Sequence, residues 1–285
     1  MRLGIFLESA PGADVIASLV TQACAAESAG LDIAWFSSTP GAETGLLAAA
    51  AVAARTSTLR LAACMPVGGH PLELAEGAAV VDNISNGRLT LVIADSGHDC
   101  DLLAETVEVI LAATAPRPFR HAGRRWQIPA NLPENDQHEA RIAVTPPVVQ
   151  TELPVWLLGL SAAQVAREWA LSCVVELEEA PAQAAKAWEE AGQLIGQAVA
   201  RLRRPALRPL VAGGDGGFDH RAVVAQLHGE EVLWGLDTAV LRLPGDLDDR
   251  ARVAAIQRIA THVRPRVVLD ALPPGLESHW DGVLD

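Results

Sequence analysis

The chain has 285 residues, of which 50% are hydrophobic and 20% are charged, so it can bury a sizeable core and is not a disordered protein. Its net charge of −13 argues against nucleic acid and anionic membranes as partners, because both bind basic surfaces. The four cysteines lie far apart with no C-x-x-C spacing, and no apolar run is long enough to span a membrane. We therefore expect a cytoplasmic protein with reduced thiols.

Short runs rich in leucine and β-branched residues alternate eight times with amphipathic, alanine-rich stretches. The runs, which we predict to be strands, cover 2–7, 32–37, 58–64, 89–94, 155–159, 172–177, 208–212 and 238–243. The stretches, which we predict to be helices, cover about 13–29, 43–56, 71–83, 101–113, 161–170, 181–200, 218–230 and 249–264. Strands that alternate with helices indicate a parallel sheet, and eight such units predict an α/β fold of the (β/α)8 barrel type. We expect residues 1–285 to form one barrel domain, with its site at the carboxyl ends of the strands.

The alternation breaks once, between about residues 115 and 153. This segment is rich in proline and contains the polar run E-N-D-Q-H-E at 134–139, which favours an irregular exposed loop. Residues 119–126 are predicted to form a small hairpin that turns at Ala122 and Gly123. We predict an irregular proline-rich excursion between the fourth and fifth βα units, not a second domain.

The predicted helix over 43–56 has more alanine than a solvent-exposed helix requires. Small side chains allow a close approach between helices, so Ala48, Ala49 and Val52 predict either ordinary core packing or the interface of a dimer. We expect a homodimer that buries these residues together with part of the helix predicted over 71–83.

Five stretches carry patterns beyond this alternation. They are M-R-L-G-I-F-L at 1–7, E-S-A-G-L-D-I-A-W at 27–35, A-A-R-T through H-P-L-E-L-A at 53–75, V-D-N-I-S-N-G-R-L at 81–89, and P-P through P-V-W-L-L-G-L-S at 146–161. In this order they resemble the bacterial luciferase-like family of flavin- or deazaflavin-dependent oxidoreductases. The fourth stretch is the most specific, because it is similar to the family's L-D-x-L-S-x-G-R. The resemblance covers nearly the whole chain.

The stretch D-N-I-S-N-G-R at 82–88 has a structural interpretation. Gly87 is a natural helix stop, and Arg88 is placed to cap the last carbonyl groups of the preceding helix. We interpret the stretch as a joint below the barrel that takes no part in the chemistry.

Gly159 and Ser161 lie where a predicted strand ends and a helix begins. We predict that Ser161 caps this helix and that the N–H groups of Ala162 and Ala163 are available to a phosphate. The alternative is a plain helix cap without a ligand. The resemblance implies that the phosphate of a flavin binds here, at Gly159, Ser161 and Ala162.

The third predicted strand ends at Ala63 and Cys64. The resemblance implies that the flavin ring approaches the backbone at these two residues, where small side chains leave room for it. Without the resemblance, we would interpret Cys64 as a buried structural thiol.

The sequence departs from the family at the predicted upper loops. The loop after the second strand reads S-S-T-P at 37–40 without a histidine, the fourth strand is followed by D-S-G at 95–97 instead of G-x-G, and the loop at 213–217 is short. His70 and His98 are the only candidates that we would test as catalytic residues, and no residue is identified as the base. The loops are also acidic, which suits a phosphate poorly. These acids are Glu8, Asp95, Asp99, Glu176, Glu178, Asp215 and Asp219.

The resemblance implies a monooxygenase that receives reduced FMN from a separate flavin reductase and oxygenates a small organic substrate. An alternative in the same class is hydride transfer with an 8-hydroxy-5-deazaflavin coenzyme. An alternative from a different class is a catalytically silent relative or partner subunit, with weak flavin binding or none. Asp95, His98 and Asp99 are of metal-binding residue types, but without an H-x-H strand pattern we expect no metal site.

Overall fold

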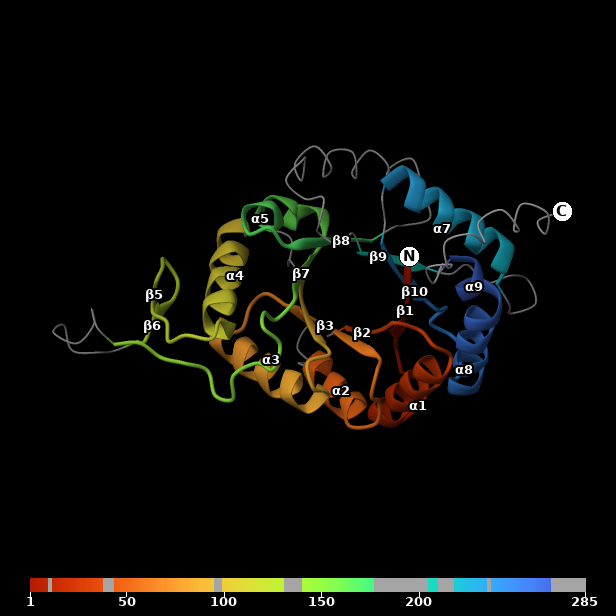
Figure 1. The fold of residues 1–285 in the computed structure, drawn as a ribbon, viewed down its shortest axis with the longest axis horizontal. Helices are drawn as coiled ribbons and strands as arrows, with labels where there is room; N and C mark the ends of the chain where they lie inside the picture. The colour runs from red at the N-terminus through yellow and green to blue at the C-terminus, as the bar shows by residue number, and fades with distance from the viewer. Residues whose placement is uncertain are drawn as a thin grey trace, which may run out of the picture.

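The computed structural model describes residues 1–9, 12–37, 44–94, 99–130, 140–176, 205–209, 218–234 and 237–267. Parallel strands form the centre of the molecule (Figure 1): β1 (Arg2–Leu7), β2 (Ile33–Ser37), β3 (Arg60–Pro66), β4 (Leu89–Ala94), β7 (Val155–Leu158), β8 (Ser172–Glu176), β9 (Pro205–Pro209) and β10 (Thr238–Arg242). Their hydrogen-bonded order, β1-β10-β9-β8-β7-β4-β3-β2, closes because β1 pairs with both β2 and β10. The predicted α/β class with a curled parallel sheet is confirmed.

Helices surround the sheet (Figure 1): α1 (Val15–Ser28), α2 (Thr44–Ala53), α3 (Pro71–Ser85), α4 (Cys100–Thr114), α5 (Ala163–Glu168), α7 (His220–Trp234) and α8 (Asp249–Arg258). The last of these continues through the π-helical turn η2 (Ile259–Val263) into α9 (Arg264–Val267). The helix predicted over 181–200 lies outside the described residues, so the complete eightfold repeat of strand and helix stays a prediction. Within the part of the chain that the structure describes, no helix is both long and apolar enough to cross a membrane.

Successive side chains along each strand point alternately into the barrel and toward the helices, as a β-strand requires. On β3, Ala62 and Cys64 belong to the buried cluster inside the barrel, whereas Leu61, Ala63 and Met65 belong to the larger cluster beneath the helices. The alternation therefore decides which residues of each strand can face a ligand in the barrel.

Two strands begin two or more residues away from their predicted starts. The third strand begins at Arg60 instead of residue 58, because the backbone N–H groups of Thr58 and Leu59 donate to Glu27 Oε1 at 2.6 and 3.0 Å. The strand predicted over 208–212 instead covers Pro205–Pro209. This placement puts proline only at the two ends of the strand, where a missing N–H disturbs the ladder least.

The predicted interface residues of α2 lie inside the protein. Ala48, Ala49 and Val52 are each at most 2% exposed and pack in the cluster beneath the helices. Their small size therefore serves core packing, and these residues cannot form the interface of a dimer.

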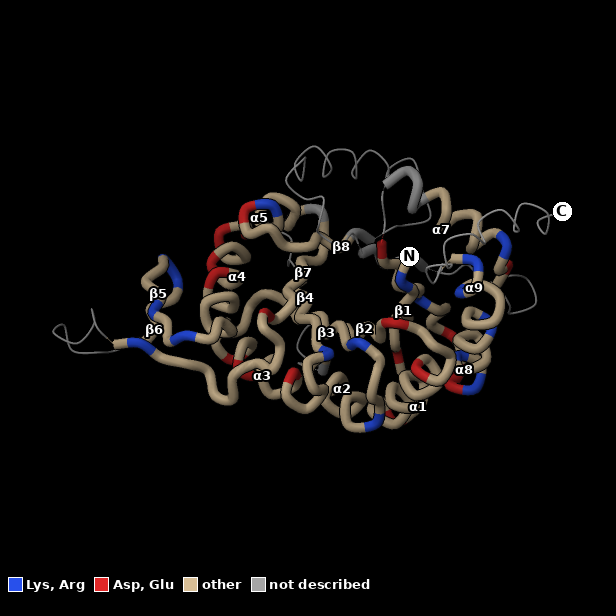
Figure 2. The backbone as a smooth tube through the Cα atoms, viewed as in Figure 1, with Lys and Arg blue, Asp and Glu red and all other residues tan. Residues whose placement is uncertain are grey.

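The segment after α4 packs as an outer layer against α3 and α4. Phe119, Ile128 and Val144 form a small buried cluster with alanines of these helices. The hairpin consists of β5 (His121–Ala122) and β6 (Gln127–Ile128), so it turns over 123–126 and not at 122–123 as predicted. Basic residues of the hairpin face acidic residues of α4 (Figure 2). Glu105 on α4 accepts hydrogen bonds from the N–H groups of Arg125 and Trp126, which fixes the turn.

Arg88 connects three chain segments at the amino-terminal side of the barrel. Its Nε donates to the carbonyl oxygen of Ser85 at 2.7 Å, which is the cap that the sequence predicts. Its Nη atoms donate to the carbonyl oxygens of Leu59 and Thr56 at 2.7 and 2.9 Å. These bonds stabilise the joint between α3 and β4.

Asp82 belongs to the same joint and is fully buried. Its Oδ2 accepts hydrogen bonds from the backbone N–H groups of Val149 and Gln150 at 2.8 and 3.2 Å, and its Oδ1 accepts from Gln150 Nε2 at 2.8 Å. The carboxylate thus fixes the point where the outer layer returns to the barrel.

Candidate functional site

The interior of the barrel is apolar and aromatic. Phe6, Trp35 and Trp156 lie in it with Cys64, and all four are buried. Ser37, Ala94 and Leu158, from the ends of β2, β4 and β7, are more exposed than the residues below them. Barrels bind their ligands at the carboxyl ends of the strands, so we call this end, around Ser37, Ala94 and Leu158, the mouth, and the buried aromatic residues below it the floor.

An ion pair joins the first and last strands at this mouth. The Arg242 guanidinium donates to Glu8 Oε1 from Nη2 at 2.5 Å and from Nε at 3.1 Å. Its Cζ also lies 4.9 Å from the centre of the Phe6 ring, close enough for a cation–π contact. Sequence reasoning counted Glu8 among the acids of the upper loops and missed this pair. The signal was the strand register, which places Arg242 beside Phe6.

The two residues predicted beneath the flavin ring have different positions. Cys64 points into the barrel and is 3% exposed, so its side chain borders the predicted site. The methyl group of Ala63 packs beneath the helices, so only its backbone could face a ligand.

The turn at the end of β7 differs from the prediction. Ser161 does not cap α5: it lies inside a 3₁₀ turn, Leu160–Ala162, and the helix cap is Ala162, which has no side-chain hydrogen bond. The N–H of Ala162 donates to the carbonyl oxygen of Gly159 at 3.2 Å, so it is not available to a phosphate as predicted. Gly159 adopts φ +102°, which favours glycine, and Ser161 is exposed beside it. The 3₁₀ turn shifts the helix start by two residues, which is why the serine misses the cap position.

His70 has a structural partner on each side. Its Nδ1 accepts a hydrogen bond from the N–H of Leu72 at 3.2 Å and thereby caps α3. Its ring packs edge-on against Trp126, with the ring centres 4.6 Å apart. The half-buried imidazole therefore fixes the loop after β3 and supports the hairpin.

The second histidine candidate, His98, lies outside the described residues, as does Asp95. Asp99 caps α4 by accepting from the N–H of Leu102 at 2.9 Å, and it forms an ion pair with Arg125. It is thus engaged in structure. The described residues contain no group of three or more His, Cys, Asp or Glu side chains placed to hold a metal ion.

The luciferase-like monooxygenase family matches residues 1–215, so the chain belongs to this family. An uncharacterized protein of Sinorhizobium fredii is 28% identical over 178 residues, which are 55% of this chain and 48% of that protein. The chain therefore spans about half the length of this curated relative.

Several solved structures share the fold at low sequence identity. A monooxygenase of Streptomyces bottropensis is 15% identical, with a TM-score of 0.77 over 94% of this chain and 100% of its own. The oxygenating constituent of 3,6-diketocamphane monooxygenase of Pseudomonas putida, in complex with FMN, is 16% identical, with a TM-score of 0.71 over 95% and 99%. The coenzyme F420-dependent tetrahydromethanopterin reductase of Methanopyrus kandleri is 15% identical, with a TM-score of 0.71 over 94% and 100%.

Proposed function

We propose that the protein is an oxidoreductase that binds a flavin or deazaflavin at the mouth of the barrel and acts on a small organic substrate. The observation that carries the proposal is the aromatic floor below more exposed strand ends, in a chain of this family. FMN, received in its reduced form from a separate flavin reductase, is our first choice of cofactor. A deazaflavin used for hydride transfer is the alternative, and a second copy of this chain is the further partner that we propose.

The residues of the mouth fit a flat ring system. Phe6 and Trp156 offer apolar contact, and the small side chains of Cys64 and Ala94 leave room for a ring to approach the backbone. When bound, a reduced flavin would supply the electrons for oxygen or hydride chemistry. The contribution of the chain is to orient the ring and to exclude water through these buried side chains.

The phosphate end of such a cofactor would depend on two groups. Ser161 offers an exposed hydroxyl beside Gly159, and Arg242 offers a positive charge that Glu8 partly neutralises. These groups support moderate affinity for an anionic cofactor. The same observations, with the engaged N–H of Ala162, favour the silent relative as the second candidate.

The test is a titration of the purified protein with FMN, reduced FMN and the deazaflavin, compared side by side with Ser161→Asp and Ser161→Ala. Neither substitution removes a helix cap, so both variants are expected to keep the thermal stability of the parent. Ser161→Asp should weaken FMN binding at least about tenfold, about 1.4 kcal/mol, and Ser161→Ala much less. Equal affinity in all three proteins would place the phosphate elsewhere. A parent without measurable affinity for any of the three would support the silent relative.

A further inference from the structure

A cavity lies at the end of the barrel opposite the mouth, where β1, β2 and β3 begin. Its volume is about 350 Å³, and it is lined by Arg2, Glu27, Gly30, Asp32, Thr58 and Arg60, among others. These residues come from the starts of the strands and from the loops that precede them, so the cavity is separated from the proposed cofactor mouth by the full length of the strands. Nothing in the proposed oxidoreductase chemistry uses it.

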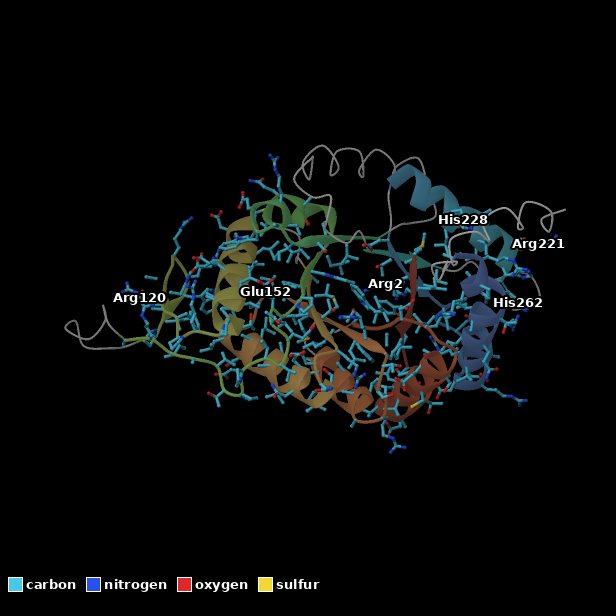
Figure 3. All side chains as sticks on the ribbon, in the orientation of Figure 1. Arg2, Arg120, Glu152, Arg221, His228 and His262 are labelled. Atoms are coloured by element: carbon cyan, nitrogen blue, oxygen red, sulfur yellow. The ribbon has the colours of Figure 1, made fainter. Side chains whose placement is uncertain are left out.

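Two arginines point toward this end of the barrel. The alternation along β1 and β3 places Arg2 on the same side as Phe6, and Arg60 on the same side as Cys64, both of which face the interior. Arg2 lies at the start of β1 (Figure 3) and is exposed, whereas Arg60 is half-buried. Neither guanidinium makes a hydrogen bond or ion pair with any residue that the structure describes.

The two guanidinium groups are close enough to repel each other. Partial burial lowers the pKa of Arg60, and the charge of Arg2 lowers it further, while Asp82 acts in the opposite direction. A third arginine is bonded to one residue of the lining, because Arg264 Nε donates to the carbonyl oxygen of Gly30 at 2.7 Å. In a chain with a net charge of −13, two guanidinium groups that line one cavity without a directly bonded carboxylate among the described residues are a specific feature.

The two carboxylates of the cavity, Glu27 and Asp32, accept hydrogen bonds from backbone N–H groups and not from the arginines. Glu27 Oε1 accepts from the N–H groups of Ser57, Thr58 and Leu59 at 2.7, 2.6 and 3.0 Å. Asp32 Oδ2 accepts from the N–H of Leu3 at 2.9 Å. Because both carboxylates serve backbone donors, neither neutralises the arginines by contact. Their charges would repel a large polyanion, so we expect a small ligand with one or two negative charges.

We propose that this cavity binds a small oxyanion, a phosphate or a carboxylate, between Arg2 and Arg60. Guanidinium groups donate in a planar fork that matches the oxygen pairs of such anions, and two forks facing one cavity hold an anion from two sides. A bound anion also offsets the repulsion between the two arginines. The site therefore adds stability when it is occupied, independently of any cofactor at the mouth.

The test measures thermal unfolding and calorimetric binding with inorganic phosphate and with malonate, at ionic strength matched with sodium chloride. The protein is expected to show a saturable rise in Tm and a measurable Kd with at least one of the two anions, and their ranking distinguishes phosphate from carboxylate. Arg60→Met and Arg2→Met should each weaken this Kd at least about tenfold. Arg167→Met, on α5 and remote from the cavity, is the matched control and should bind like the parent.

Removal of either arginine relieves repulsion, so both variants are expected to fold with an unchanged or higher Tm without anion. An absence of saturable binding in the parent would overturn the proposal. So would equal Kd values in parent, Arg60→Met and Arg2→Met, because that result would indicate adventitious ion binding elsewhere. The assay contains no flavin, so its outcome is independent of the proposed oxidoreductase function.

Discussion

Arg242, at the end of the last strand, is hydrogen-bonded to Glu8, which directly follows the first strand, with 2.5 Å between Nη2 and Oε1. The pair spans 234 positions of sequence and marks the seam at which the barrel closes. Half of the Arg242 side chain is exposed, so the pair contributes little to stability, and its effect falls mainly on ligands at the mouth.

Opposite effects are therefore predicted for the two partners. Glu8→Gln leaves the positive charge of Arg242 uncompensated and should strengthen FMN binding about threefold or more, whereas Arg242→Gln should weaken it by a similar factor. Fluorescence titration at low and high salt measures both, and salt should reduce both changes. Changes of the same sign in the two variants would contradict a charge effect.

The pH dependence of stability should report on Glu27. Partial burial alone would raise the pKa of this carboxyl, but hydrogen bonds from the backbone of Thr58, Leu59 and Ser57 and from the Thr58 hydroxyl lower it to about 2. Because the folded-state pKa lies below the ordinary value of 4.5, the ionised carboxylate stabilises the fold above pH 4.5, and this contribution is lost as the pH falls toward 2. Glu27→Gln should lower Tm at pH 7. Between pH 4.5 and 2, the Tm of this variant should fall less than the Tm of the parent.

The control for this measurement is Glu152→Gln, at an exposed carboxyl just before β7 (Figure 3). It should follow the parent at every pH. If Glu27→Gln also shows the parent's full acid-induced loss of Tm, the hydrogen bonds to the backbone do not depend on its charge.

A structural role for His70 is separable from a catalytic one. His70→Ala removes the cap of α3 and the contact with Trp126, and should lower stability by about 1 kcal/mol. His70→Asn retains a capping oxygen and should recover a large part of that loss in thermal denaturation. We expect His70→Asn to oxidise the flavin at a rate near that of the parent. A complete loss of this activity would instead identify His70 as a catalytic residue.

The interface of a homodimer has to consist of residues other than the alanines of α2, because those are buried within the protein. Leu47 on α2 is 66% exposed, and Val80 and Ile84 on the neighbouring α3 are 43% and 47% exposed. We predict that this apolar surface forms the interface, so the double variant Leu47→Glu, Ile84→Glu should sediment as a monomer where the parent sediments as a dimer. Val149→Glu, at an exposed residue of the outer layer, is the control and should leave sedimentation unchanged.

Local patterns predicted most of the strands. β1 and β4 begin and end where their apolar runs do, because each run is bounded by polar residues or turn formers. The start of β3 was not predictable in this way, since it depends on the carboxylate of Glu27, some thirty residues earlier. The pairing of Arg242 with Glu8 was hidden for the same reason, because it needs the register of two strands at opposite ends of the chain.

The candidate site was less predictable than the fold. Cys64 was correctly expected to be buried, and the alternation of β3 explains why its side chain and not that of Ala63 reaches the interior. Ser161 has the residue type of a helix cap, but the 3₁₀ turn moved the helix start beyond it. A difference of two residues in a turn is below what sequence patterns resolve, yet it decides which N–H groups are free.

The hydrogen bonds of Asp82 to Val149 and Gln150 have a consequence for synthesis of the chain on the ribosome. Asp82 leaves the ribosome 68 residues before Gln150. At roughly 5–20 residues per second, its partners follow roughly 3–14 s later. During this interval the nascent β1–β4 sheet has an unpaired edge on β4, because β7 lies further along the chain than Gln150. The arrival of Gln150 closes the joint just before β7 is made, so the order of synthesis delivers the next strand to an edge that is already fixed in place.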